Sequence, residues 1–364
     1  MRTAVTVVTG FPAILAAILA ASVLGGCGDS SRTTVSHAPT VKTLGTIERL
    51  DPAFDALVPM DATMEVIAEG FDWIEGPLWV PEKFGGGYLL FSDIPPNVVL
   101  KWTPGKGIST YLGQSGWLGP IPRPDASAPD EPGSNGLILD PQGRLILCQH
   151  GLRQVARMDA SLGMPAAKFV PLAATFEGKR HNSPNDGAFL PNGDLYYTDP
   201  PYGLPRKMED PYKELDFQGV YRVTPHGVVT LMTKELSRPN GLAFSPDFKT
   251  AYVAISDPKR AVWMKFPLKD DGTFGDGAVF FDAGSRVGKM KGLPDGLKVD
   301  KQGNLFATGP GGVLVFNKDG KHLGTLLTGQ ATSNCAFGDD GKTLYITADS
   351  YLLRIKLSTT GNGF

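Results

Sequence analysis

The feature that most constrains the fold is a short phrase that occurs six times along the 364-residue chain. One copy, LPDGLKVDKQGNLFATG (293–309), begins with an acidic residue and a glycine, alternates apolar and polar residues, turns at 300–303 and alternates again. This pattern is typical of two short strands joined by a tight turn. The oxygen-bearing residues at the start of the six copies, called the strand-start residues below, are Glu75, Asn135, Asn185, Asn240, Asp295 and Asn334.

The spacing of these copies indicates the architecture. Neighbouring copies lie between 39 residues apart (Asp295 to Asn334) and 60 residues apart (Glu75 to Asn135). Repeats of roughly 40 to 55 residues built from short strands are the signature of β-propeller blades. We therefore predict an all-β fold, a six-bladed β-propeller over residues 61–364, in which the innermost strand of each blade lines a central channel.

All six strand-start residues carry a side-chain oxygen. Equivalent positions in six blades converge at one end of the channel, so the sequence predicts a ring of oxygens there. Two carboxylates, Glu75 and Asp295, together with amide oxygens are a ligand set for a hard cation such as Ca²⁺. We expect a metal site in the central channel. Asn135 and Asn334 stay open between a role around the metal and a structural role, because Asn-Gly pairs also form turns.

Composition and missing motifs exclude several classes of function. The formal net charge is −2 and no basic run is present, which argues against nucleic acid as a partner. The chain has no G-x-S-x-G, H-E-x-x-H or P-loop motif, so serine esterase, zinc protease and nucleotide hydrolase lack their residues. Cys148 and Cys335 lie in apolar strands of different copies, and we expect both to be buried free thiols.

The N-terminus is expected to lie outside the propeller. The apolar run FPAILAAILAASV (11–23) is followed by Leu24, two glycines and Cys27, which resembles the lipobox of bacterial lipoproteins. Residues 1–26 would be the signal peptide, Cys27 the lipidated residue, and residues 27–60 a tether with an approach strand. We expect a lipid-anchored protein of the bacterial cell envelope that faces the periplasm or the exterior. A transmembrane anchor is the alternative.

Several ordered motifs resemble a known family. SPND (183–186), TDPPYG (198–203), EGPLW (75–79), RPNGL (238–242) and PDG (294–296) are similar to motifs of the gluconolactonase branch of the regucalcin/gluconolactonase family. The resemblance extends over about residues 64–356, nearly the whole propeller. It implies a six-bladed propeller that holds a divalent cation, usually calcium, in its channel.

The resemblance also implies roles for single residues. Glu75, Asn240 and Asp295 match the family's metal ligands. Asn185 matches an asparagine that faces the substrate and, in some members, the metal as well. Asp295 also matches the residue proposed to accept the proton of the reaction, which makes it the candidate catalytic residue.

The substrate-orienting arginine is the point at which the sequence departs from the family pattern. The regucalcin branch has an arginine two residues before the matching asparagine, where this chain has Ser183. Arg180 is the candidate replacement, and His150 is a second candidate substrate-binding residue. The proline-rich segment 116–133 is expected to be a long loop near one mouth of the channel, either covering a ligand or forming a surface insertion.

We therefore expect a lactone hydrolase that depends on a divalent metal, with Ca²⁺ first and Mg²⁺, Mn²⁺ or Zn²⁺ as alternatives. Glucono-1,5-lactone or a related aldonolactone is the leading small-molecule substrate. Hydrolysis of another ester, such as an aryl lactone or a phosphotriester, stays open, as does a non-catalytic propeller that binds a sugar. Because a closed propeller needs no partner to complete its sheets, we expect a monomer that meets the membrane only through its lipid.

Overall fold

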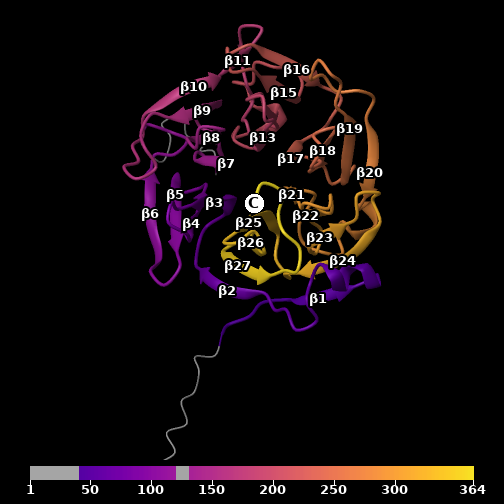
Figure 1. Cartoon of the computed structure of the whole chain (residues 1–364). Helices are drawn as coiled ribbons and strands as arrows, with labels where there is room; N and C mark the ends of the chain where they lie inside the picture. The colour runs from indigo at the N-terminus through magenta and orange to yellow at the C-terminus, as the bar shows by residue number, and fades with distance from the viewer. Residues whose placement is uncertain (1–40, 120–130) are drawn as a thin grey trace, which may run out of the picture. The chain divides into compact units, whose positions relative to one another are not determined.

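The computed structural model describes residues 41–119 and 131–364. Six antiparallel sheets of at least four strands surround a central axis as the blades of a propeller (Figure 1). Within the described residues the helical segments are three short 3₁₀ turns, η1 (Pro52–Ala56), η2 (Lys207–Glu209) and η3 (Gly284–Arg286). The predicted six-bladed fold is confirmed. Residues 1–40, which include the expected signal peptide and Cys27, lie outside the described residues.

Blades 1 to 3 follow one another along the chain, and each is a four-stranded meander whose first strand is innermost. Their strands are β3 (Ile74–Pro81), β4 (Gly87–Asp93), β5 (Val98–Thr103) and β6 (Gly107–Gly113) in blade 1; β7 (Ser134–Leu139), β8 (Leu145–Gln149), β9 (Gln154–Met158) and β10 (Phe169–Ala173) in blade 2; and β13 (Gly187–Phe189), β14 (Leu195–Asp199), β15 (Gly219–Val223) and β16 (Val229–Thr233) in blade 3.

Blades 4 to 6 repeat this arrangement. Their strands are β17 (Pro239–Phe244), β18 (Thr250–Ile255), β19 (Val262–Pro267) and β20 (Ala278–Asp282) in blade 4; β21 (Leu297–Val299), β22 (Leu305–Gly309), β23 (Gly312–Phe316) and β24 (His322–Leu327) in blade 5; and β25 (Thr332–Gly338), β26 (Thr343–Ala348) and β27 (Tyr351–Lys356) in blade 6. A small hairpin of β11 (Thr175–Phe176) and β12 (Lys179–Arg180) lies between blades 2 and 3 in the sequence.

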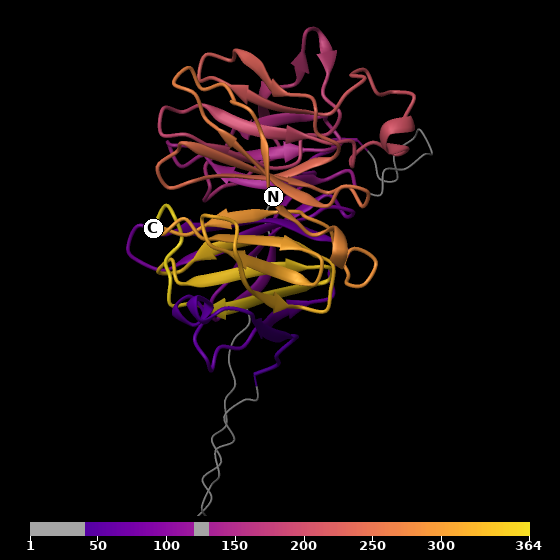
Figure 2. The same cartoon turned by 90° about the vertical axis from the view of Figure 1, so that its right-hand side faces the viewer.

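The ring is closed by strands from the N-terminal part of the chain. β2 (Glu65–Glu69) pairs with β27 and supplies the outer strand that blade 6 lacks. β1 (Thr46–Arg49) pairs with β24 as a fifth strand of blade 5, so the N-terminal strands lie beside the C-terminal blades (Figures 1 and 2). The described fold therefore reaches further toward the N-terminus than the expected boundary at residue 61.

The hydrophobic core lies between neighbouring blades. Trp79 of β3 stacks on Tyr345 of β26 with ring centroids 5.6 Å apart, and Trp263 of β19 lies 5.4 Å from Phe316 of β23. Burial of a large apolar side chain stabilises a fold by about 1.5–3 kcal/mol, so these layers hold each blade against the next. Cys148 and Cys335 are buried and free, as expected.

Glycines that follow strand-start residues allow the inner strands to approach one another. A Cβ atom on Gly241 would lie closer than 3 Å to the backbone oxygen of Asp295 in the next blade. The same holds for Gly76 against Asn135 between blades 1 and 2 and for Gly136 against Asn185 between blades 2 and 3, and Gly296 would meet the side chain of Asn334 in blade 6. The residue-glycine pairs are therefore sites of close backbone approach, not turns.

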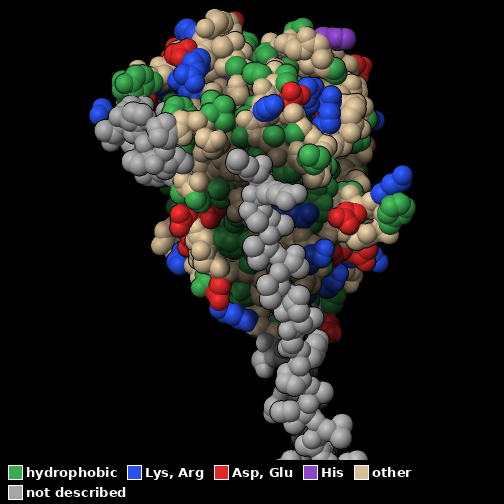
Figure 3. Space-filling view, turned by 90° about the vertical axis from the view of Figure 1, so that its left-hand side faces the viewer, with side chains coloured by type: hydrophobic (Ala, Val, Ile, Leu, Met, Phe, Trp, Pro, Cys, Tyr) green, Lys and Arg blue, Asp and Glu red, His purple; other side chains and the backbone are tan. Residues whose placement is uncertain are grey.

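The surface around blades 1 and 2 carries charges of both signs. Basic and acidic side chains are interspersed there with single apolar ones (Figure 3). Among the described residues, no helix has the length and apolarity needed to span a membrane.

Candidate functional site

A cavity of about 360 Å³ lies at the end of the channel where the inner strands begin. Five of the six strand-start residues line it, and they come from five different blades. Closure of the ring brings these side chains together from positions up to 220 residues apart, from Glu75 to Asp295. The other lining residues are Trp73, Glu131, Tyr202, Arg238, Ser256, Gly292, Leu293, Ala331 and Thr332.

Irregular strand pairing at the strand starts changes the direction of these side chains. The register shifts between Glu75 and Leu78 in blade 1, and between Ser134 and Leu137 in blade 2. Blade 4 has the same irregularity between Pro239 and Leu242. Bulges of this kind re-aim a side chain next to a site. They explain how an oxygen at the start of a strand and an apolar residue three positions later both reach the channel.

The sixth strand-start residue, Asn334, lies behind the cavity and does not line it. Its Oδ1 accepts a hydrogen bond from the Cys335 amide at 2.9 Å. Hydrogen bonding from its side chain partly offsets the rise in pKa of both Glu75 and Asp186, so Asn334 lies between these two carboxyl groups. This placement favours the structural role over metal ligation for Asn334.

The two strand-start carboxyls have strongly perturbed acidity. Burial, and then repulsion from Asp186 among other groups, raises the pKa of Glu75 to about 8. Burial raises the pKa of Asp295 well above its ordinary value, and Glu75, Asp186 and Glu131 add to the rise. Negative charge gathered in a buried cavity is costly, and a cation bound among these oxygens would relieve that cost.

The donor set fits a hard cation. Asn135 Oδ1 and Asp295 Oδ1 are buried and accept no hydrogen bond from the described residues. In the part of the chain that the structure describes, no three His, Cys, Asp or Glu side chains come together closely enough to hold an ion by themselves. Amide oxygens from Asn185 and Asn240 would therefore have to complete the set, as suits Ca²⁺ better than zinc.

Asn185 is held by a rigid segment. Both carboxylate oxygens of Asp199 accept backbone hydrogen bonds at 2.8 Å, one from Asn182 and one from Ser183. The Asn185 amide donates to Thr198 O at 2.9 Å, and its carbonyl accepts from Gly136 of blade 2 at 2.8 Å. Blade 3 therefore fixes the backbone on which the amide side chain is carried.

Glu131 is a site residue that the sequence did not reveal. It precedes β7, at the end of the proline-rich segment, and lines the cavity. Its Oε2 lies 3.5 Å from Nδ1 of the fully buried His150. Burial alone would raise the pKa of Glu131, but the neighbouring His150 and the charge of Lys207 lower it.

Of the three residues expected to bind substrate, Asn185 lines this cavity, and His150 and Arg180 do not. His150 is fully buried, and its Nδ1 lies 3.5 Å from Oε2 of Glu131, which lines the cavity. Arg180 lines a separate cavity of about 170 Å³, together with Arg153 and Tyr212, and its guanidinium donates to Leu152 O at 3.3 Å. The basic residue that does line the cavity is Arg238, from the start of blade 4.

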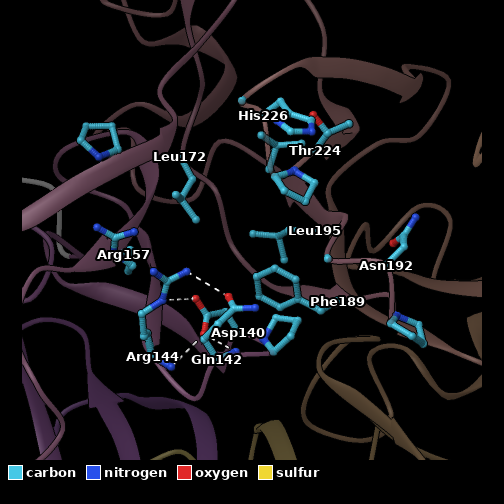
Figure 4. A pocket seen from close by; sticks show the side chains of 17 residues that line it. Asp140, Gln142, Arg144, Arg157, Leu172, Phe189, Asn192, Leu195, Thr224 and His226 are labelled. Carbon is cyan, nitrogen blue, oxygen red and sulfur yellow. Dashed lines mark hydrogen bonds and ion pairs between the residues drawn. The ribbon is translucent and has the colours of Figure 1, made fainter.

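A groove of about 470 Å³ between blades 2 and 3 is larger than the channel cavity but holds no strand-start residue. Figure 4 shows Arg144 turned toward Asp140, with which it pairs at 2.6 Å. Arg157 and His226 line the same groove. Because its charged pair is satisfied internally, we place the candidate site in the channel.

The chain is similar in sequence and in fold to gluconolactonases. The family profile described as SMP-30/Gluconolactonase/LRE-like region matches residues 73–350. A gluconolactonase from Zymomonas mobilis subsp. mobilis is 38% identical over 357 residues, which cover 95% of each chain. The structure of a putative gluconolactonase is similar with a TM-score of 0.74 at 32% identity, covering 88% of this chain and 100% of that one. For a gluconolactonase from Xanthomonas campestris the TM-score is 0.72 at 30% identity, with 89% and 99% covered.

Proposed function

The chain belongs to the SMP-30/gluconolactonase/LRE-like family and is a lactonase, and from that premise we propose that it hydrolyses an aldonolactone in the channel cavity with the help of a divalent cation. Glucono-1,5-lactone is the leading substrate. The observation that carries the proposal is the gathering of five strand-start oxygens, two of them from carboxyl groups, in one cavity.

Glu75, Asn185, Asn240 and Asp295 would hold the cation. All four line the cavity, and together they present carboxylate and amide oxygens only. This chemistry favours Ca²⁺, with Mg²⁺ and Mn²⁺ next and Zn²⁺ last. When bound there, a divalent cation supplies Lewis acidity toward an ester carbonyl and lowers the pKa of water.

Asp295 would accept the proton in the reaction. As the water oxygen forms its bond to the lactone carbonyl carbon, Asp295 takes one proton from that water. The same proton then passes to the ring oxygen as the ring C–O bond breaks, which leaves an open-chain acid. In the metal-free protein, burial and the neighbouring Glu75 raise the pKa of Asp295, and a bound cation would lower it again and keep the carboxylate ionised to accept the proton.

Asn185 and Tyr202 would orient the substrate. Asn185 lines the cavity on a backbone fixed by Thr198 and Gly136. Tyr202 lines it too; its hydroxyl donates to Ser256 O at 2.9 Å and Lys207 Nζ lies 5.8 Å from its ring centroid, and the part of the ring that lines the cavity would contact a sugar.

The test is a substrate panel with the purified protein and Ca²⁺. We expect hydrolysis of glucono-1,5-lactone above its spontaneous rate, and weaker turnover of an aryl lactone and a phosphotriester. Turnover of the phosphotriester or aryl lactone alone would shift the assignment to another ester. Binding of the sugar lactone without any turnover would support a non-catalytic propeller.

Location at the cell envelope is a separate proposal that rests on the apolar run 11–23 and the segment from Leu24 to Cys27. Mass spectrometry of the mature protein tests it: a diacylglyceryl group on an N-terminal Cys27 is the expected result. An unmodified Cys27 within an uncleaved chain would contradict it.

A further inference from the structure

We propose that Arg238 is the residue that orients the substrate by binding the carboxyl end of the opened lactone and the carbonyl end of the closed one. The proposal rests on the function proposed above and deepens it. It replaces Arg180, which the sequence favoured and which lines a different cavity.

The position of Arg238 in the chain places it at the channel cavity. It lies two residues before the strand-start residue Asn240 and lines the same cavity as Glu75 and Asp295. Its charge is also among the influences on the pKa of Tyr202, another lining residue, whose pKa burial raises. Because Arg238 and Asp295 line the same cavity, a lactone carbonyl on which Asp295 acts would lie in the cavity that Arg238 also lines.

The backbone of Arg238 is held in an unfavourable conformation. Its φ angle is 47°, in the left-handed region that residues other than glycine rarely adopt. Hydrogen bonds fix it on both sides, because Arg238 N donates to Gln218 Oε1 at 2.6 Å and Arg238 O accepts from Ser256 N at 3.0 Å. Of the described non-glycine residues with positive φ, Arg238 is the one that lines the cavity. Strain of this kind is concentrated at functional sites.

The guanidinium of Arg238 has no hydrogen-bond or ion-pair partner among the described residues. Glu131 lines the same cavity but lies 3.5 Å from His150, and within the described residues no ion pair joins Arg238 to Glu131, Glu75 or Asp295. Asp257 is close enough for Arg238 to contribute to its lowered pKa, after the opposing effect of burial and the hydrogen bonds from Lys259 and Ser237. An arginine without a partner beside a reactive cavity is ready to bind a carboxylate.

This role predicts how Arg238 would recognise the ligand. Every lactone has the carbonyl, and every hydrolysis product has the carboxylate, so Arg238 would act on substrates with and without hydroxyl groups. Its bond to the anionic product would be the stronger of the two because both partners are charged.

The test compares Arg238→Gln with Arg260→Gln, which changes an exposed arginine between β18 and β19 of the same blade. We expect Arg238→Gln to raise KM about 10- to 100-fold for both glucono-1,5-lactone and δ-valerolactone, the range of a hydrogen bond to a charged group. Arg238→Lys should restore part of this loss. Calorimetric titration with gluconate should show weaker binding to Arg238→Gln and unchanged binding to Arg260→Gln.

Arg238→Gly separates recognition from folding. Glycine adopts positive φ without strain, so this variant should melt at the wild-type temperature or higher while KM rises as in Arg238→Gln. A melting temperature that falls with KM unchanged would assign Arg238 a structural role and overturn the inference. If Arg180→Gln raises KM and Arg238→Gln does not, the inference is also overturned.

The two proposals fail in different ways. A wild-type protein that hydrolyses no lactone defeats the proposed function, and gluconate binding then still tests Arg238. A wild-type protein that hydrolyses lactones while Arg238→Gln keeps the wild-type KM and gluconate affinity defeats only the inference.

Discussion

The two ends of the channel are lined by the same six inner strands but have opposite character. The end at which the strands begin has a cavity of about 360 Å³ with Glu75, Asp295 and three asparagines in its wall. The far end has a cavity of about 350 Å³ lined mainly by apolar residues, which include Leu78, Leu137, Phe189, Phe244 and Phe337. Asp186 and Lys298 are its charged residues within the described chain.

The difference shows that strand register places the chemistry. Glu75 and Leu78 are three residues apart on one strand, yet they line opposite cavities, with the register shift between them. At the end where the inner strands begin, called the oxygen end below, the segments that precede the strands contribute Glu131 and Arg238 to the cavity wall. At the far end, the lining residues outside the strands include Phe248 from a strand turn and Asn362 and Phe364 from the C-terminal segment.

If the chemistry lies at the oxygen end only, the largest loss of activity is expected from Asp295→Asn. The change keeps the size of the side chain but removes its ability to accept a proton, so kcat/KM for the lactone should fall about 10²- to 10⁴-fold. Initial rates at saturating Ca²⁺ measure it, and a circular dichroism spectrum like that of the wild type shows that the fold is intact. Activity within threefold of the wild type would remove Asp295 from the mechanism.

Adding a methyl group at Gly241 should lower the stability of the propeller. Gly241→Ala places a Cβ against the backbone of Asp295, and overpacking of this kind costs about 1–3 kcal/mol. Gly163→Ala is the control, because nothing lies within 4 Å of its Cβ and its φ is not positive. Chemical denaturation measures both. Equal stability of the two variants would mean that the inner strands do not need the close approach.

The carboxyls of the oxygen end should make the metal-free protein less stable as pH rises. Glu75 has a pKa of about 8 in the fold and an ordinary value of 4.5, so the folded state binds more protons than the unfolded state between these values. Its contribution to stability is therefore present below pH 4.5 and is lost as pH rises toward 8. Thermal unfolding in chelator at pH 5, 6, 7 and 8 measures this loss.

Glu75→Gln is the control for the pH dependence, because it cannot titrate. Its melting temperature should fall less over the same pH range than that of the wild type. Saturating Ca²⁺ should likewise reduce the loss in the wild type. A wild type and a variant with the same pH dependence would show that Glu75 is not responsible.

The smallest effect on activity is expected at the far end. Phe337 is buried there and lies edge-on to Phe306 at 5.3 Å, so Phe337→Leu should lower stability by about 1 kcal/mol. The lactonase kcat and KM should stay at their wild-type values. A loss of activity larger than the loss of folded protein would show that the far end takes part in catalysis.

The sequence predicted the six blades and the ring of strand-start oxygens, but it did not predict the other residues that line the cavity. Six copies of one phrase predicted six blades, because the repeat is local in the chain. The strand-start oxygens share one register, so their convergence followed from the fold. The role of the glycines could not be predicted from the sequence, because an Asn-Gly pair is also typical of a turn. The close packing of Gly241 against the Asp295 backbone shows that role.

Site residues outside the repeated phrase could not be predicted from the sequence, for a physical reason. Glu131 and Arg238 come from the approaches to two blades, where no periodic pattern fixes the direction of a side chain. Arg180 was favoured because it is near Asn185 in sequence, but the chain carries it into the neighbouring cavity. The positive φ of Arg238 has no signal in the sequence, since arginine does not favour that conformation.

The central claim is that the ring of oxygens holds a divalent cation needed for lactone hydrolysis. The most direct test is the rate of glucono-1,5-lactone hydrolysis by the purified protein before chelation, after chelation, and after return of Ca²⁺. Activity that disappears with chelator and returns with Ca²⁺ is the result the account predicts. Full activity in a protein shown by elemental analysis to hold no divalent metal would contradict it.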